Sequence, residues 1–197
     1  MVGLGNPGDR YSGTRHNVGF DVVEAFAKRA AGGPARIDRL DCRALTGRVR
    51  VAGRPVLVAR PQTFMNDSGA SVKGLTSKYG VPPERLVVVS DEAALPLGQL
   101  RLGRSGSAGG HQGLQSVIDG LGTEGFPRLR LGVRGDNFRP DEDLADFVLE
   151  RFSKAERPAV DEAIERASEA LSVFVEDGLD AAMNRFNRSP EEAPENT

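Results

Sequence analysis

The sequence predicts an α/β protein with one domain, from three observations. Short apolar runs alternate with stretches in which apolar residues recur at helical spacing, the pattern of strands joined by helices. The run Leu86–Val89 is apolar throughout, which is typical of a strand buried on both faces of a sheet. A chain of 197 residues, 39% of them hydrophobic, can bury one substantial core, and no linker is long enough to divide it.

The first expected elements lie within Val2–Phe20. An apolar run at Val2 and Leu4 predicts a strand, a tight glycine-rich loop carries Asn6, and a helix follows whose first turn carries His16. In α/β sheets, ligands bind beyond the carboxyl ends of the strands, and both polar residues flank such an edge. One amide and one imidazole suffice to polarise a carbonyl and to activate a water.

Two alternatives compete with this interpretation. The glycines from Gly3 to Gly8 fit G-x-G-x-x-G, the pattern of a dinucleotide site. In that pattern the helix opens within the glycine run and its free N–H groups bind the pyrophosphate. Here Pro7 lacks an N–H, and Tyr11–Gly13 delay the helix. The second alternative is that His16 is a helix-end histidine with a purely structural hydrogen bond.

The middle of the chain predicts a hairpin, a loop, a helix and a buried strand. The expected elements are strands at Ala44–Val51 and Arg54–Ala59, a polar loop at Arg60–Gly69, a helix at Ala70–Tyr79 and the strand at Leu86–Val89. The last strand is expected to end in Ser90, Asp91 and Glu92, which places carboxylates at a strand terminus.

The second half predicts two further strands and mostly helix after them. The expected elements are a strand at Leu97–Leu102, a glycine-rich loop at Arg104–Gln112, a helix at Gly113–Leu121, a strand at Arg128–Val133, helices at Asp141–Glu150 and Lys154–Glu176, and final turns at Leu179–Phe186. Residues 1–188 are expected to form a single catalytic domain. The segment Ser189–Thr197 is expected to be a disordered tail.

The net charge of −2 does not by itself indicate a nucleic-acid partner. Basic residues are concentrated between Gln99 and Arg139, however, and acidic residues dominate from Asp141 onward, so one face can be basic. The alternative is an ordinary solvated arginine face. A single cysteine, Cys42, excludes an internal disulfide and indicates a reducing cytoplasm.

Targeting and metal signals are weak. The start has neither a charged n-region nor a long apolar h-region, and no apolar stretch approaches the length of a membrane span. Two histidines, His16 and His111, are too few for a convincing zinc site without cysteines. We therefore expect a cytoplasmic protein without a membrane partner and without a metal.

Four loops carry the candidate chemistry, at Asn6, His16, Asn66 and Asp91, and a fifth carries His111 with Gln112. A histidine base needs a partner on its second ring nitrogen to fix the tautomer, and Asp91 is suitable, although an isolated aspartate there is often a turn former. No serine lies in a G-x-S-x-G elbow. Water activated by His16 is therefore a simpler mechanism than covalent catalysis.

Four segments together resemble the bacterial peptidyl-tRNA hydrolase family: GLGNPGDRYSGTRHNVGF, RPQTFMNDSG, VVVSDEAALPLGQLRL and GSAGGHQGLQSVIDGLGTEGFPRLRLGV. The resemblance runs in order from Val2 to about Asn187. It implies an α/β domain with a twisted mixed sheet flanked by helices. It also implies an enzyme that cleaves the ester between a peptide and the 3′ ribose of tRNA, recycling tRNA from abandoned chains. The resemblance implies no metal or cofactor, and action mainly as a monomer.

The resemblance also implies roles for individual residues. His16 is the expected general base, Asp91 stabilises its proton-accepting form, and Asn6 contacts the substrate near the ester. The remaining positions are expected in tRNA or substrate binding: Tyr11, Phe64, Asn66, His111 and Gln112, with Met65 beside Phe64 in an apolar wall and Arg130 at a phosphate contact.

This chain departs from the family pattern at three positions. Gln112 replaces the usual Asn after the second histidine, Ala94 replaces the second aspartate of a DELDLP-like run, and Gly103 replaces a lysine. The changes bear on substrate affinity more than on the reaction. A non-catalytic alternative exists, because the same fold occurs in plant organellar splicing factors that act as RNA-complex partners. The set of Asn6, His16, Asn66 and Asp91 favours an enzyme.

Overall fold

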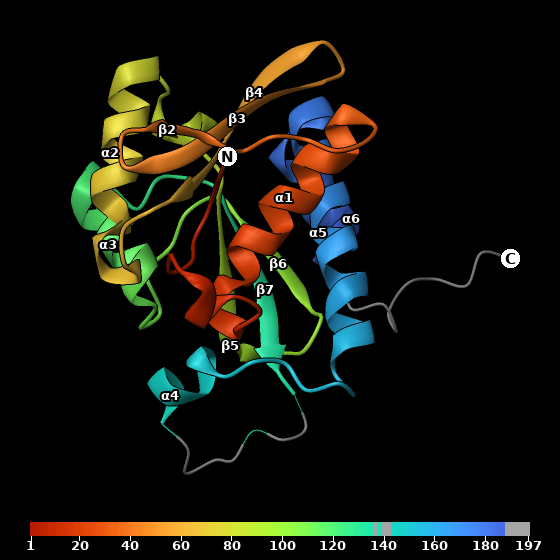
Figure 1. The fold of residues 1–197 in the computed structure, drawn as a ribbon. Coiled ribbons are helices and arrows are strands. Elements are labelled where there is room, and N and C mark those ends of the chain that lie inside the picture. The colour runs from red at the N-terminus through yellow and green to blue at the C-terminus, as the bar shows by residue number, and fades with distance from the viewer. Residues whose placement is uncertain (136–137, 139–142, 188–197) are drawn as a thin grey trace, which may run out of the picture.

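The computed structural model describes residues 1–135, 138 and 143–187. In this part of the chain the strands form one seven-stranded sheet with the order β2-β3-β4-β1-β5-β7-β6. Figure 1 shows the sheet with helices packed around it. The expected tail at Ser189–Thr197 and the start of the expected helix Asp141–Glu150 lie outside the described residues.

The centre of the sheet is parallel and its margins are antiparallel. The parallel strands are β1 (Val2–Gly3), β4 (Arg54–Pro61), β5 (Val88–Pro96) and β7 (Arg128–Arg134). The antiparallel strands are β2 (Arg39–Asp41) and β3 (Ala44–Val51) at one margin and β6 (Leu100–Gly103) at the other. The sheet is therefore mixed, as the family resemblance implies.

Helices cover both faces of the sheet. On one face, α1 (Val18–Ala31), α5 (Arg157–Asp177) and α6 (Leu179–Phe186) enclose one apolar core. On the other, α2 (Ser68–Tyr79) and α3 (Gln112–Leu121) enclose a second core. The short helix α4 (Leu144–Leu149) lies at one end of the sheet (Figure 1). Among the described residues, no helix is long and apolar enough to span a membrane.

The first glycines bring β1 against α1. A Cβ on Gly3 would lie 2.1 Å from the carbonyl oxygen of Gly19, so only glycine fits this contact. A Cβ on Gly5 would meet the ring of Phe20 at 2.9 Å. The helix α1 begins only at Val18, after two 3₁₀ turns. The glycine run therefore serves strand–helix packing, and no helix N-terminus opens within it as a pyrophosphate site requires.

Periodicity predicted most of the elements, with one correction that affects the site. The expected end of the strand near Asp91 is wrong, because β5 continues to Pro96. Asp91 pairs with Leu131 of β7. The backbone hydrogen bonds between β5 and β7 keep this segment extended even though its side chains are polar. The strand also begins at Val88 rather than at Leu86. Because Gly3 of β1 is level with Val89, Asp91 lies beyond the end of β1 although it is inside β5.

Smaller differences concern element ends. The strand β2 was not expected, since it has only three residues, two of them exposed. The helix α2 begins at Ser68 instead of Ala70, and β6 begins at Leu100 instead of Leu97. His16 lies in a separate 3₁₀ turn, Arg15–Asn17, directly before α1.

Candidate active site

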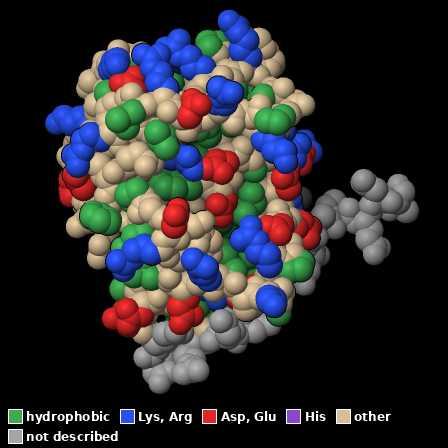
Figure 2. Space-filling model, in the orientation of Figure 1, with side chains coloured by type: hydrophobic (Ala, Val, Ile, Leu, Met, Phe, Trp, Pro, Cys, Tyr) green, Lys and Arg blue, Asp and Glu red, His purple; other side chains and the backbone are tan. Residues whose placement is uncertain are grey.

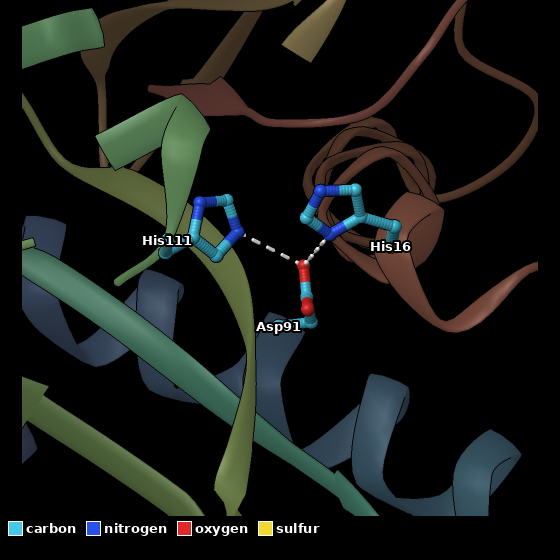
Figure 3. Close-up of side chains that lie close together, drawn as sticks. All are labelled: His16, Asp91 and His111. Carbon is cyan, nitrogen blue, oxygen red and sulfur yellow. Dashed lines mark hydrogen bonds and ion pairs between the residues drawn. The ribbon is translucent and has the colours of Figure 1, made fainter. Parts of the chain in front are cut away.

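Two histidines share one carboxylate oxygen at the centre of the site. The ring nitrogen Nδ1 of His16 lies 2.8 Å from Oδ1 of Asp91, and Nε2 of His111 lies 3.0 Å from the same atom. Figure 3 shows the two rings on either side of the carboxylate, and their centroids are 4.9 Å apart. The residues come from the turn before α1, from β5 and from the start of α3. The expected pairing of His16 with Asp91 is thus present in the structure.

The helix α3 determines the tautomer of His111. This residue is the N-cap of α3, and its Nδ1 accepts hydrogen bonds from the backbone N–H groups of Gly113 and Leu114, at 3.1 and 3.2 Å. A nitrogen that accepts carries no proton in neutral imidazole, so Nε2 carries it and donates to Asp91. His16 donates to the same oxygen through Nδ1. Its Nε2 is then the nitrogen free to accept a proton.

The carboxylate of Asp91 is ionised at neutral pH although it is buried. Burial by itself raises the pKa of Asp91, but its electrostatic attraction to the imidazoles of His111 and His16 and the hydrogen bonds from both outweigh burial and hold that pKa well below its usual range. Burial lowers the pKa of His111, and Asp91 outweighs this effect and raises it. We assign His111 as neutral nevertheless, because a proton on Nδ1 would break both bonds to the start of α3.

The same geometry decides whether the cluster suits a metal ion. One ligand atom from each of His16, Asp91 and His111 lies within 4.8 Å of the other two. A metal-binding imidazole carries its proton on the nitrogen that faces away from the metal. In His111 that nitrogen is the acceptor of two N–H groups, so Nε2 has no lone pair to offer. The arrangement suits a hydrogen-bonded triad better than a metal centre.

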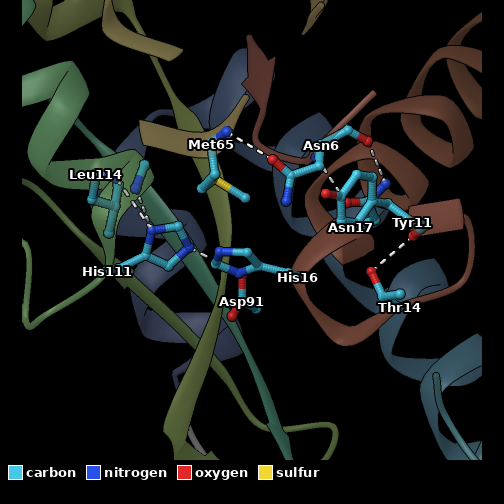
Figure 4. Close-up of polar contacts among 10 residues, drawn as sticks. Asn6, Tyr11, Thr14, His16, Asn17, Met65, Asp91, His111 and Leu114 are labelled. Atoms are coloured by element: carbon cyan, nitrogen blue, oxygen red, sulfur yellow. Dashed lines mark hydrogen bonds and ion pairs between the residues drawn. The ribbon is translucent and has the colours of Figure 1, made fainter. Parts of the chain in front are cut away.

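Asn6 is held so that its amide nitrogen faces the cleft. Its Oδ1 accepts the backbone N–H of Met65 at 2.8 Å. Its own backbone N–H and C=O bond to the side chain of Asn17, at 2.8 and 2.9 Å. Figure 4 shows the amide nitrogen of Asn6 on the side where His16 and Asp91 lie. An N–H donor on this side of the cleft can stabilise a developing oxyanion.

These groups form the floor of a cleft of about 740 Å³. Phe64, Asn66 and Gln112 line its sides, and Leu144 and Leu149 of α4 line it as well. Phe64, Leu144 and Leu149 are exposed apolar side chains, so part of the wall suits an apolar ligand. Met65 also lines the cleft but is buried.

Two expected binding residues do not line the cleft. Tyr11 lies outside it, with the guanidinium of Arg10 4.6 Å from its ring centroid. Arg130 lies in β7, and its Nη1 forms an ion pair with Oε2 of Glu92 at 3.0 Å. Glu92 does line the cleft, so Arg130 is one residue removed from it.

Two residues support the site although the sequence argument gave them no role of their own. Asn17 fixes the backbone of Asn6, as described above. Arg15 is fully buried, donates to the carbonyl of Val133 at 3.1 Å and pairs with Glu156 at 3.0 Å. Its guanidinium also lies 4.4 Å from the ring centroid of Phe147 in α4. Arg15 thus connects the turn that carries His16 to α4, the helix that lines one side of the cleft. The only signal in the sequence is its place directly before His16.

Comparisons with known proteins show which family this chain is similar to. A model of the peptidyl-tRNA hydrolase family matches residues 1–194. The peptidyl-tRNA hydrolase of Alkaliphilus metalliredigens is 46% identical over 187 residues, which cover 95% of this chain and 98% of that protein. The enzyme of the same name from Halalkalibacterium halodurans is 44% identical over the same shares. A crystal structure of peptidyl-tRNA hydrolase from Acinetobacter baumannii has a TM-score of 0.85 and 33% identity, and covers 94% of this chain and 92% of that chain.

Proposed function

This chain belongs to the peptidyl-tRNA hydrolase family, and we propose that it cleaves the ester between a peptide and the 3′ ribose of tRNA with a water activated by His16. The observation that carries the mechanism is the set of three atoms at the cleft floor. These are the free Nε2 of His16, the ionised Asp91 on its Nδ1, and the amide nitrogen of Asn6 beside them.

The reaction has two steps. In the first, His16 Nε2 takes a proton from water, the water oxygen bonds to the ester carbon, and Asn6 stabilises the resulting oxyanion. Asp91 stabilises the imidazolium formed on His16. In the second, the oxyanion collapses, the bond from carbon to the ribose oxygen breaks, and the imidazolium returns its proton to that oxygen. The products are a free peptide acid and tRNA with a 3′-hydroxyl.

The cleft accommodates both parts of the substrate. Phe64 and Leu144 offer apolar surface to a peptide, and the amides of Asn66 and Gln112 offer hydrogen bonds to the acceptor end. A single-stranded 3′ end can enter such a cleft, whereas a duplex stem stays outside and is held by its phosphates. The proposal includes action as a monomer, in the cytoplasm and without a metal ion.

The decisive experiment compares N-acetyl-aminoacyl-tRNA with unblocked aminoacyl-tRNA as substrates. We expect hydrolysis of the blocked substrate and little of the other. His16→Ala should reduce kcat by about 10² to 10⁴ while tRNA binding and the melting temperature stay near wild type. Activity of the variant within a few-fold of wild type would show that another group is the base. Binding of tRNA without any hydrolysis by the wild type would favour the non-catalytic alternative.

A further inference from the structure

Four exposed arginines follow the β2–β3 margin of the sheet. Arg39, Arg43, Arg48 and Arg50, here called the arginine stripe, are all exposed. Arg39 is directly opposite Thr46, and side chains alternate along a strand, so Arg39, Arg48 and Arg50 share the face of Thr46.

This is the face on which α2 lies. Ala44 has the same orientation in β3 as Arg48 and belongs to the core that contains Val72 and Leu75 of α2. The guanidinium of Arg48 lies 5.7 Å from the ring centroid of Tyr79, the last residue of α2. Figure 2 shows Lys and Arg side chains gathered over the upper part of the molecule, where Figure 1 places β2, β3 and α2.

One end of the stripe adjoins the cleft. The carbonyl of Arg43 accepts the N–H of Gln62 at 2.7 Å, and its guanidinium pairs with Asp67 at 2.6 Å. Gln62 and Asp67 flank the loop that carries Phe64 and Asn66 into the cleft. From Ala44 the strand β3 runs away from this loop for about 20 Å to Arg50, at about 3.3 Å per residue.

The outer charges of the stripe are not neutralised by neighbours. Among the residues that the structure describes, Arg39, Arg48 and Arg50 have no carboxylate within ion-pair distance. The nearby carboxylate of Asp41 is already bonded to Lys78 and Tyr79. Arg50 donates to the carbonyl of Gly53, which leaves its charge unpaired. The protein as a whole has a net charge of −2, so this surface differs from the average.

The basic stretch expected between Gln99 and Arg139 is less available. Arg128 is buried and donates to the carbonyls of Ser107 and Glu124. Arg130 and Arg104 are paired with Glu92 and Asp180, although Arg101 and Arg134 are exposed. Arg139 lies outside the described residues. In the described part of the chain, three arginines of the stripe, Arg39, Arg48 and Arg50, therefore form a larger set of unpaired cations than Arg101 and Arg134 do.

We propose that the arginine stripe binds the phosphate backbone of the double-stranded part of the tRNA whose 3′ end occupies the cleft. This inference rests on the proposed function. Guanidinium groups bind phosphates in bidentate fashion, and residues two apart in a strand repeat at about 7 Å, which suits a chain of phosphates better than one small anion. Contacts of this kind hold the register of a duplex and are insensitive to its sequence.

The test removes three charges and compares two substrates. The variant R39Q/R48Q/R50Q keeps Arg43 and its pair with Asp67 intact. Its control, K28Q/K154Q/R185Q, removes the same number of exposed positive charges elsewhere: on α1, in the segment before α5, and on α6, where Arg185 is paired with Glu169. Each protein is assayed with full-length N-acetyl-aminoacyl-tRNA and with a short N-acetyl-aminoacyl 3′-end fragment.

For the stripe variant we expect KM for the full-length substrate to rise about tenfold at low salt with kcat unchanged, and kinetics on the short fragment like those of wild type. The slope of log affinity against log salt should flatten by about two to three units, nearly one for each phosphate contact. Wild-type KM and slope in the stripe variant, or an equal loss in the control, would overturn the assignment. Loss on the short fragment as well would also overturn it. Failure of the wild-type protein to hydrolyse either substrate would instead refute the proposed function.

Discussion

The substitution Asp91→Asn tests the catalytic assignment most directly, because it removes a charge and little else. Oδ1 of Asp91 accepts hydrogen bonds from His16 at 2.8 Å and from His111 at 3.0 Å. The amide oxygen of asparagine can accept both, so the two rings keep their positions. The variant lacks the negative charge that stabilises the imidazolium formed when His16 takes a proton from water.

The size of the effect follows from the contact. A unit charge pair about 4 Å apart at an effective dielectric constant of about 20 is worth about 4 kcal/mol, which corresponds to about 10³ in rate. The side chains of His16 and Asp91 are both largely buried, so solvent screening reduces this interaction energy only slightly. In the serine-protease triad the equivalent change costs about 10⁴ in kcat. We expect Asp91→Asn to lower kcat by about 10³ and to leave KM within a few-fold of wild type.

The assay is steady-state hydrolysis of N-acetyl-aminoacyl-tRNA, with Glu92→Gln as the control. Glu92 is the next residue, lines the same cleft and undergoes the same change of charge, but it pairs with Arg130 and not with a histidine. The control should keep kcat within a few-fold on the short 3′-end fragment. If Asp91→Asn changes only KM, Asp91 binds substrate and the pairing with His16 is not catalytic.

Three further outcomes follow from the structure. The family resemblance implies a phosphate contact at Arg130, so Arg130→Ala should weaken tRNA binding and flatten its salt dependence by about one unit without slowing cleavage of the short fragment. Because Arg130 is already paired with Glu92, an unchanged slope would leave the phosphate contacts to the arginine stripe. Gln112→Asn should keep activity and change KM by no more than about tenfold, the range of one neutral hydrogen bond, whereas Gln112→Ala should lose that bond; alanine kinetics equal to wild type would remove Gln112 from the site. Because the pKa of Asp91 is lowered on folding, its stabilising contribution is present above the unfolded value of about 4 and is lost as pH falls below it. The unfolding free energy of wild type should thus fall more steeply than that of Asp91→Asn in acid denaturation below about pH 4, and parallel curves would contradict this sign.

Local patterns in the sequence were sufficient for most of the elements. The hairpin β3–β4 was predicted because its strands alternate and the turn between them carries Gly53, and α2 because Gly80 ends it with a left-handed conformation. The three-residue β2 was not predicted, because it depends on its pairing with β3 rather than on a pattern of its own. The end of β5 was misjudged for the same reason, since pairing with β7 carries the strand through polar residues.

Site residues could be predicted where the residue type alone indicates a chemical role. Contacts between two segments distant in the sequence could not be predicted. His16, Asp91 and Asn6 could be selected by residue type and by their expected places at strand ends, although Asp91 lies inside β5. The contact of both His16 and His111 with Oδ1 of Asp91 could not be predicted, because it depends on how closely α3 approaches β5 and on the loop that carries Met65. A Cβ on Gly113 would lie 2.3 Å from the sulfur of Met65 and 3.0 Å from the ring of His111. The sequence does not reveal this close packing at Gly113, because the glycines around it predict only a loop.

The double role of His111 joins the stability of α3 to the chemistry of the cleft. The same ring accepts two N–H groups at the start of the helix and donates to Asp91 on its other side. Capping bonds of this kind contribute about 0.5–2 kcal/mol to the stability of a helix. The His111 tautomer with its proton on Nε2, which caps α3, is therefore more stable than the tautomer with its proton on Nδ1. In that tautomer Nε2 always presents a proton to Asp91, which holds the carboxylate in place for His16. The start of α3 is therefore connected to His16, the proposed general base, through one imidazole and one carboxylate oxygen.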